Sequence, residues 1–273
     1  MNISIDNWIT ALVDFLMDHG QLFFDIISFS LETLTYGIEE ILLFPPTWLL
    51  IILLSALTWW RTTWRFTTFA VAALVLIVGM DLWQETIVTL ALVIAATLIS
   101  LSIGIPLGIL CARENWIAKI MRPVLDLMQT MPAFVYLIPA AMFFGLGQVP
   151  GVVATIIFAM PPAVRLTNLG IREVPKDRLE AGLAFGCTPW QLLLKVQLPA
   201  AKPSIMAGVN QTIMLALSMV VITSMIGAGG LGDTVLRGIQ RLDVGLGFEG
   251  GLGVVILAII LDRITQSFGK KNE

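Results

Sequence analysis

The sequence EAGLAFGCTPWQLLLKVQLP, residues 180 to 199, decides how this chain is interpreted. It belongs to a polar segment, residues 172 to 202, that separates two long apolar runs. Pro175 fits the first turn of a short helix, where its missing N–H costs nothing, and Gly186 can end that helix in a left-handed cap. The segment therefore predicts a helix that stops at a tight turn.

A second short helix is predicted directly after this turn. Thr188 supplies an N-cap hydroxyl, Pro189 a first residue whose φ is already helical, and Gln191 the partner of a capping box. Pro199 is expected to end the helix, because a proline disfavours helical conformation in the residue before it. Residues 172 to 202 are thus predicted to form a helix-turn-helix.

Composition places this loop in a membrane protein. The chain has 273 residues, of which 57% are hydrophobic and only 13% charged, beyond the composition of soluble domains. A membrane span needs about 20 apolar residues. We therefore expect an all-α integral membrane protein with about seven transmembrane helices, near residues 43 to 60, 64 to 80, 86 to 110, 131 to 147, 149 to 164, 204 to 226 and 247 to 265.

The distribution of basic residues predicts the orientation of these spans. With seven spans and the N-terminus outside, 14 of the 16 lysines and arginines face the cytoplasm, and only Arg237 and Arg241 lie outside. Cytoplasmic loops are enriched in basic residues. We expect a multi-pass protein of a prokaryotic plasma membrane with a cytoplasmic C-terminus and a cytoplasmic loop at 172 to 202, with Cys111 and Cys187 on the same side.

Residues 1 to 44 carry acidic side chains spaced among apolar ones and no basic residue. This pattern is typical of an amphipathic helix at the membrane interface, although a scaffold helix at the periphery fits equally well. A removable signal peptide is not expected, since a basic first region and a cleavage site are missing. Two peripheral spans at 45 to 80 and a core at 81 to 268 complete the predicted organisation.

The cytoplasmic segment resembles the EAA loop of ATP-binding-cassette importer permeases: Glu-Ala-Ala, three residues, Gly, nine residues, Ile, one residue, Leu-Pro. The matching residues are Glu180, Ala181, Gly186, Leu198 and Pro199, whereas Gly182 and Val196 depart from the pattern conservatively. The resemblance implies a MetI-like permease fold and a loop that docks on an ATPase subunit.

The runs DLMQTMPAFVYLIPA, GVVATIIFAMPPAVR and NQTIMLALSMVVITSMIGAGGLG resemble glycine betaine and proline betaine permeases in particular. That branch implies a homodimeric pathway, two ATPase subunits and an external binding protein that delivers the solute. Permeases for taurine, sulfonates, methionine or other amines are the alternatives within the class. A secondary transporter is disfavoured, because the predicted spans lack central ionisable residues.

The sequence offers no catalytic or metal constellation and no phosphate-binding G-x-x-x-x-G-K-[ST] loop, so no cofactor is expected in this chain and ATP is expected on the partner. The G-x-G-x-x-G match at Gly227, Gly229 and Gly232 follows a membrane helix and favours a glycine-rich turn. The polar residues that follow this turn offer either a contact for the binding protein or a simple connector. His19 is expected at the interface, and no nucleic-acid partner is expected.

Candidates for the translocation pathway come from two regions. On the sixth span, a stripe at helical spacing comprises Asn210, Met214, Ser218 and Met225, with Val221 between them. Tyr136 and Phe143 are aromatic candidates, since aromatic faces attract quaternary ammonium groups. Helix packing explains the stripe equally well, with Asn210 bonded to a neighbouring span. Gly104, Pro106 and Gly108 predict close helix packing in the third span.

Overall fold

The computed structural model describes residues 5–269, and within this range every regular element is a helix. The order is α1 (Ile5–Leu43), α2 (Thr47–Arg61), α3 (Trp64–Gly79), α4 (Trp83–Arg113), α5 (Asn115–Thr130), η1 (Ala133–Tyr136), α6 (Leu137–Phe144), α7 (Gln148–Arg172), α8 (Lys176–Ala184), α9 (Pro189–Leu192), η2 (Leu193–Gln197), α10 (Leu198–Ser224), α11 (Leu231–Arg241) and α12 (Val244–Gly269). The predicted all-helical fold class is confirmed.

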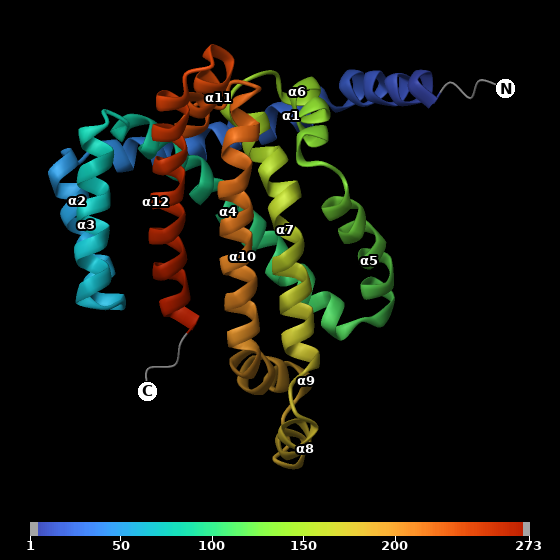
Figure 1. Ribbon diagram of the computed structural model, residues 1–273. Coiled ribbons are helices and arrows are strands. Elements are labelled where there is room, and N and C mark those ends of the chain that lie inside the picture. The colour runs from blue at the N-terminus through green and yellow to red at the C-terminus, as the bar shows by residue number, and fades with distance from the viewer. Residues whose placement is uncertain (1–4, 270–273) are drawn as a thin grey trace.

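The helices form a bundle with two distinct ends (Figure 1). At one end α1 runs across the bundle near α6 and α11, and at the other α8 and α9 project beyond the remaining helices. The α2–α3 turn and the C-terminal end of α12 lie toward the α8 end, so that the basic segments of the sequence gather there. Lys270 and Lys271 lie outside the described residues.

Four helices are long and apolar enough to cross a membrane: Trp83–Arg113, Gln148–Arg172, Pro189–Ser224 and Val244–Phe268. Two bent pairs also pass, Phe15–Leu43 with Thr47–Arg61 at 98° and Asn115–Thr130 with Ala133–Phe144 at 106°. All seven predicted runs fall on helices, although α3 is only 16 residues long. The fourth span is corrected: within the predicted run of residues 131 to 147 the helical part is only η1 with α6, Ala133–Phe144, and Pro132 separates it from α5, which forms the other half of the bent pair.

The centre of the bundle is held by close packing of α4 on α7. A Cβ atom on Gly104 would lie 2.9 Å from Cβ of Ala163, and one on Gly108 would lie 2.7 Å from Cβ of Thr167. Both glycines are buried. Small residues let helix backbones approach closely where hydrophobic attraction between helices is weak. The predicted close packing in the third span is confirmed.

Helix α1 packs on the bundle with one side only. Leu31 is buried among α4 and α7 side chains, whereas Leu22, Phe23 and Phe29 are 77%, 62% and 71% exposed. His19 is exposed and stacks on Phe15. Residues 1–4 and the side chains of Asp6, Leu12 and Asp14 lie outside the described part. The helix thus presents an apolar side away from the bundle, as a helix at the membrane interface would.

The prediction that Pro199 ends the second loop helix is wrong. Pro189–Ser224 forms one continuous helix of 36 residues, in which Leu193–Gln197 takes π-helical hydrogen bonds. A proline inside an α-helix removes one N–H and clashes with the preceding turn. The wider π segment in front of Pro199 relieves this conflict, so the loop continues into α10 without a break.

Candidate functional site

The turn after α8 has the geometry that its sequence predicts. Gly186 has φ of 77°, its N–H donates to the Leu183 carbonyl at 2.9 Å, and the Cys187 N–H donates to the Gly182 carbonyl at 3.0 Å. These bonds form a Schellman motif, which confirms the left-handed cap. Pro175 was expected inside the first turn of this helix. It instead precedes the helix as the N-cap residue, with an extended backbone at ψ of 134°, and α8 begins at Lys176.

The capping box of the second helix is also confirmed. The Thr188 N–H donates to Oε1 of Gln191 at 2.9 Å, and the Gln191 N–H donates to the Thr188 hydroxyl at 3.4 Å. Pro189 occupies the first turn. Both ends of the turn are therefore fixed by residues within the loop itself.

Side chains then fix the two loop helices against each other and against the bundle. Gly182 is buried, and a Cβ atom placed there would lie 2.7 Å from Cδ1 of Leu192 and 3.5 Å from Cγ2 of Val196. The Arg113 guanidinium lies 4.5 Å from the Trp190 ring centroid, so the end of α4 contacts α9. The small residue at 182 is therefore required by contact between α8 and the helix that follows the turn.

The outer side of the loop is exposed and partly apolar. Phe185 is 90% exposed, Leu194 58% and Leu183 57%, and Glu180 and Ala181 on α8 are also exposed. Val196 and Leu198 are half-buried, whereas Pro199 is exposed. Exposed apolar side chains on a rigid, projecting element are typical of a protein–protein contact surface.

Helix α10 presents an exposed stripe along the bundle. Met214 and Met225 are 40% and 63% exposed, Ser218 is exposed between them, and Val221 is half-buried. The Ser218 hydroxyl donates to the Met214 carbonyl at 2.9 Å, within its own helix. Three of the six predicted pathway residues therefore share one open face.

Asn210 lies at the edge of this stripe and contacts α12. Its Nδ2 donates to Asp262 at 2.7 Å, and its Oδ1 accepts from the Thr265 hydroxyl at 2.8 Å. Asp262 also accepts from Nε2 of Gln266 at 2.8 Å. For Asn210 the sequence allowed either a place in the pathway or a hydrogen bond to a neighbouring span, and the structure shows hydrogen bonds to α12.

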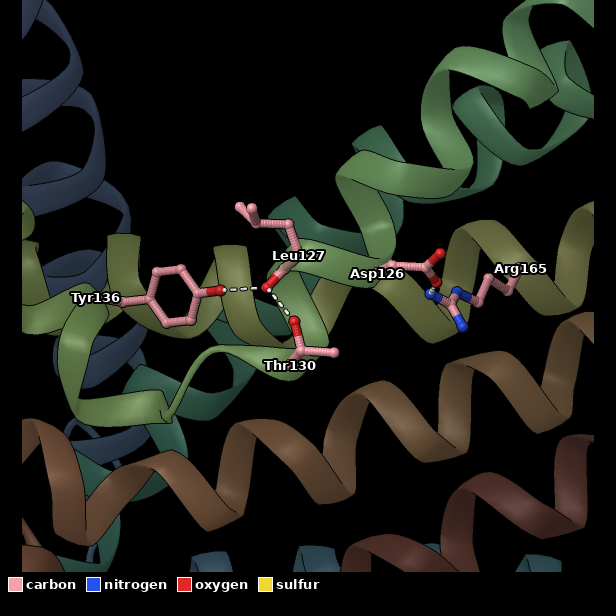
Figure 2. A network of polar contacts seen from close by, with 5 residues as sticks. All are labelled: Asp126, Leu127, Thr130, Tyr136 and Arg165. Atoms are coloured by element: carbon pink, nitrogen blue, oxygen red, sulfur yellow. Dashed lines mark hydrogen bonds and ion pairs between the residues drawn. The ribbon is translucent and has the colours of Figure 1, made fainter.

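The two aromatic candidates make contacts inside the chain. The Tyr136 hydroxyl donates to the carbonyls of Met128 at 3.0 Å and Leu127 at 3.3 Å, the latter shown in Figure 2. The ring of Phe143 stacks on Phe24 of α1, with centroids 4.6 Å apart. Tyr136 thus supplies a donor to the Met128 carbonyl, which receives none from the residue four positions on because that residue is Pro132. The Leu127 carbonyl also accepts from the Met131 N–H and the Thr130 hydroxyl. Phe143 attaches α6 to α1.

An ion pair that sequence reasoning missed joins α5 and α7. Arg165 of α7 donates to Asp126 of α5 at 2.5 Å, and the two side chains are 41% and 65% exposed (Figure 2). A cavity of about 360 Å³ adjoins the pair and is also lined by Arg122, Asn168 and Arg172. The predicted span ended at residue 164, but α7 continues to Arg172, which brings Arg165 into the bundle.

The glycine-rich match forms a turn, as predicted. Gly227, Gly229 and Gly230 have positive φ between α10 and α11, and the Leu231 N–H donates to the Thr89 hydroxyl at 2.8 Å. A nucleotide-binding G-x-G-x-x-G segment follows a β-strand, whereas these glycines follow helix α10, so the match does not indicate a nucleotide site. Among the described residues, no three His, Cys, Asp or Glu side chains are grouped to hold a metal ion.

Residues 104–272 match the family model described as binding-protein-dependent transport system inner membrane component. The chain is a member of this family. It is 52% identical to the glycine betaine/proline betaine transport system permease protein ProW of Escherichia coli, over 99% of this chain and 76% of that protein. It is 53% identical to the glycine betaine/carnitine transport permease protein GbuB of Listeria monocytogenes, over 98% and 96%.

A solved structure supports the fold of this permease. An inward-facing form of the MetNI methionine ABC transporter matches with a TM-score of 0.58 at 25% identity, over 69% of this chain and 92% of that one. The MetI-like fold implied by the loop is therefore confirmed, and the protein is a multi-pass permease of an inner membrane.

Proposed function

We propose that this chain is the membrane subunit of an ATP-driven importer for glycine betaine, proline betaine or a related methylated amine, delivered by an external binding protein. The observation that carries the substrate class is identity of 48% to 53% to three betaine permeases along nearly the whole chain. Related permeases for trimethylamine N-oxide, at 37% identity, take a solute with the same methylated nitrogen.

In this proposal the α8–α9 loop docks on the ATPase subunit, which holds the ATP and carries out the hydrolysis. The exposed Phe185, Leu183 and Leu194 supply an apolar contact, and Glu180 adds a carboxylate at its edge. Such a surface fits a groove with apolar walls and a basic rim. Because η2 continues into α10, movement of a docked loop would be transmitted to the membrane helix.

The open face of α5, α7 and α10 would form the pathway together with a second copy of the chain. Asp126 and Arg165 are costly against lipid but favourable in a water-filled passage. Met214, Ser218 and Met225 extend the same open surface along α10. We accordingly place the pathway on this face, with Tyr136 and Phe143 as supporting residues.

The α8 end of the bundle would face the cytoplasm, which puts the N-terminus outside. This orientation collects the basic segments on the cytoplasmic side, as the positive-inside rule requires. The opposite end then faces the binding protein. Exposed apolar side chains there include Leu146, Leu242 and Phe248, at 80%, 88% and 68%.

The test is reconstitution of the permease with its cognate ATPase and binding protein in proteoliposomes. Glycine betaine or proline betaine should stimulate ATP hydrolysis and accumulate in the vesicles, whereas taurine and methionine should do neither. Stimulation by taurine or methionine instead would assign the chain to another substrate class. Betaine uptake without ATP hydrolysis would contradict the ATP-driven mechanism.

A further inference from the structure

An open cavity of about 620 Å³ lies between the α2–α3 turn and the C-terminal part of α12. Three arginines from three helices line it: Arg61, Arg65 and Arg263. The remaining lining residues are Thr62, Thr63, Phe66, Phe69, Gln266 and Ser267. The volume falls within the range of ordinary small-ligand sites.

The positive charge of this cavity is not neutralised by the described part of the chain. None of the three arginines makes an ion pair among the described residues, and no carboxylate is part of the lining. Asp262, which precedes Arg263, accepts hydrogen bonds from Asn210 and Gln266 instead. Three neighbouring guanidinium groups repel one another unless an anion lies between them.

The arginine at the centre of the cluster is held in place yet lacks a hydrogen-bond acceptor. The Arg61 guanidinium carbon lies 4.1 Å from the Phe268 ring centroid and 4.4 Å from that of Trp60. Its Nε is buried and has no partner among the described residues. A guanidinium ordered between two rings keeps its planar fork of N–H donors in a fixed orientation, which suits it to bind an anionic oxygen through its terminal nitrogens rather than through the buried Nε.

The hydroxyl groups of Thr62 and Ser267 beside the arginines already donate to backbone carbonyls, so an anion in the cavity would be bound by the arginines. Thr62 and Ser267 each donate to a carbonyl of their own helix at 2.6 Å. Thr63 is the N-cap of α3 and lines the cavity, so the N-terminal end of that helix adjoins it. The N-terminus of a helix favours a bound anion, which adds to the charge of the arginines.

The surroundings of the cavity indicate a lipid rather than a dissolved ion. Trp59, Trp60 and Trp64 are 71%, 74% and 66% exposed around the α2–α3 turn. Exposed tryptophans of a membrane protein concentrate at the level of the lipid headgroups. Phe66 and Phe69 add apolar lining beside the arginines, suitable for the glycerol and upper acyl part of a lipid.

We propose that this cavity binds the phosphate of an anionic membrane lipid, with Arg61, Arg65 and Arg263 as its ligands. Guanidinium groups bind phosphate oxygens in pairs, and basic pockets between membrane helices bind anionic headgroups. The lipid would connect the peripheral α2–α3 hairpin to α12. This proposal requires only that the chain is embedded in a membrane, and it does not depend on the transported solute.

The experiment is native mass spectrometry of the full chain released from nanodiscs of equal parts phosphatidylglycerol and phosphatidylcholine. The wild-type protein should retain phosphatidylglycerol preferentially. Each arginine contributes about 1 kcal/mol near an anionic surface, so Arg61→Gln and Arg263→Gln should each reduce retention about five-fold. Arg65→Gln should act similarly, and because its side chain is exposed it tests the site without disturbing packing.

Lys119→Gln is the matched control, since Lys119 is an exposed basic residue on α5 outside this cavity. It should leave retention unchanged, and Arg263→Lys should keep more lipid than Arg263→Gln. Equal retention of both lipids, or equal retention by wild type and all three glutamine variants, would refute the site. A second arm adds inorganic phosphate at millimolar concentration: if it displaces phosphatidylglycerol completely, the cavity binds free anions and the assignment to lipid is wrong.

Discussion

The turn at Gly186 allows backbone strain to be separated from steric contact. A Cβ atom placed on Gly186 would meet no atom within 4 Å, yet φ is 77°, in the region that L-residues rarely adopt. Any loss of function in a Gly186 variant should therefore come from the backbone alone. We expect Gly186→Asn to be tolerated, Gly186→Ala to be impaired and Gly186→Val to be impaired most.

The magnitude follows from the left-handed conformation. It costs an alanine about 1–2 kcal/mol, and more for a β-branched residue, whereas asparagine adopts it with little penalty. Since about 1.4 kcal/mol corresponds to a factor of ten, the equilibrium constant for forming the correctly capped loop should fall about five- to thirty-fold in Gly186→Ala. Solute-stimulated ATP hydrolysis should fall by up to that factor, because a displaced second helix cannot dock on the ATPase.

The assay is ATP hydrolysis and solute uptake by the purified complex in proteoliposomes, with monodispersity and membrane level as checks on folding. Gly37→Val is the matched control, because Gly37 is helical with ordinary φ and its Cβ position is equally open. It should leave activity intact. If Gly186→Val transports like wild type, or if Asn, Ala and Val impair transport equally, the left-handed cap does not control coupling.

Three further predictions concern orientation, the broken span and the open face. A membrane-impermeant maleimide added to intact cells should label Gln240→Cys and leave the partly exposed Cys187 unlabelled. Labelling of Cys187 would show that the orientation is the reverse of the one proposed. Tyr136→Phe should lower the free energy of unfolding by about 1–3 kcal/mol, measured by denaturation in detergent, because the Met128 carbonyl of α5 loses its side-chain donor; an unchanged stability would show that this carbonyl is satisfied otherwise. Asp126→Arg should reduce uptake while lowering the free energy of unfolding by at most about 1 kcal/mol, because the ion pair is exposed. Adding Arg165→Asp should restore uptake. No recovery in the double variant would exclude the pair from the pathway.

The features that sequence predicted well are those decided by neighbours in the chain. The Gly186 cap and the Thr188–Gln191 box involve residues three to five positions apart, so composition and spacing suffice to place them. Pro199 shows the limit of this reasoning. A proline usually ends a helix, but the π segment Leu193–Gln197 just before it changed the outcome, and nothing in LLKVQ announces that segment.

The sequence allowed a bond from Asn210 to a neighbouring span but could not name the partner, and it did not predict the ion pair of Arg165, because both depend on contacts between distant segments. Asn210 meets Asp262 across 52 positions, and Arg165 meets Asp126 across 39. The second contact also required the break at Pro132, which separates α5 from α6 and lets α5 lie beside α7 (Figure 2). The polar positions 122, 126 and 129 of α5, at helical spacing, were the available signal for a polar face there.

The continuity of η2 with α10 connects the loop to the open face mechanically. A loop joined to its membrane helix through a flexible linker could dock without moving the helix, because the linker would absorb the displacement. Here residues 189 to 224 form one helix, the Arg113–Trp190 contact fixes its lower end, and Met214, Ser218 and Met225 lie along its open side. A push on Phe185 or Leu194 is therefore expected to displace that side together with the loop. The π segment at 193 to 197 carries Leu194 of the proposed docking surface and continues without a break into the helix that bears the open side.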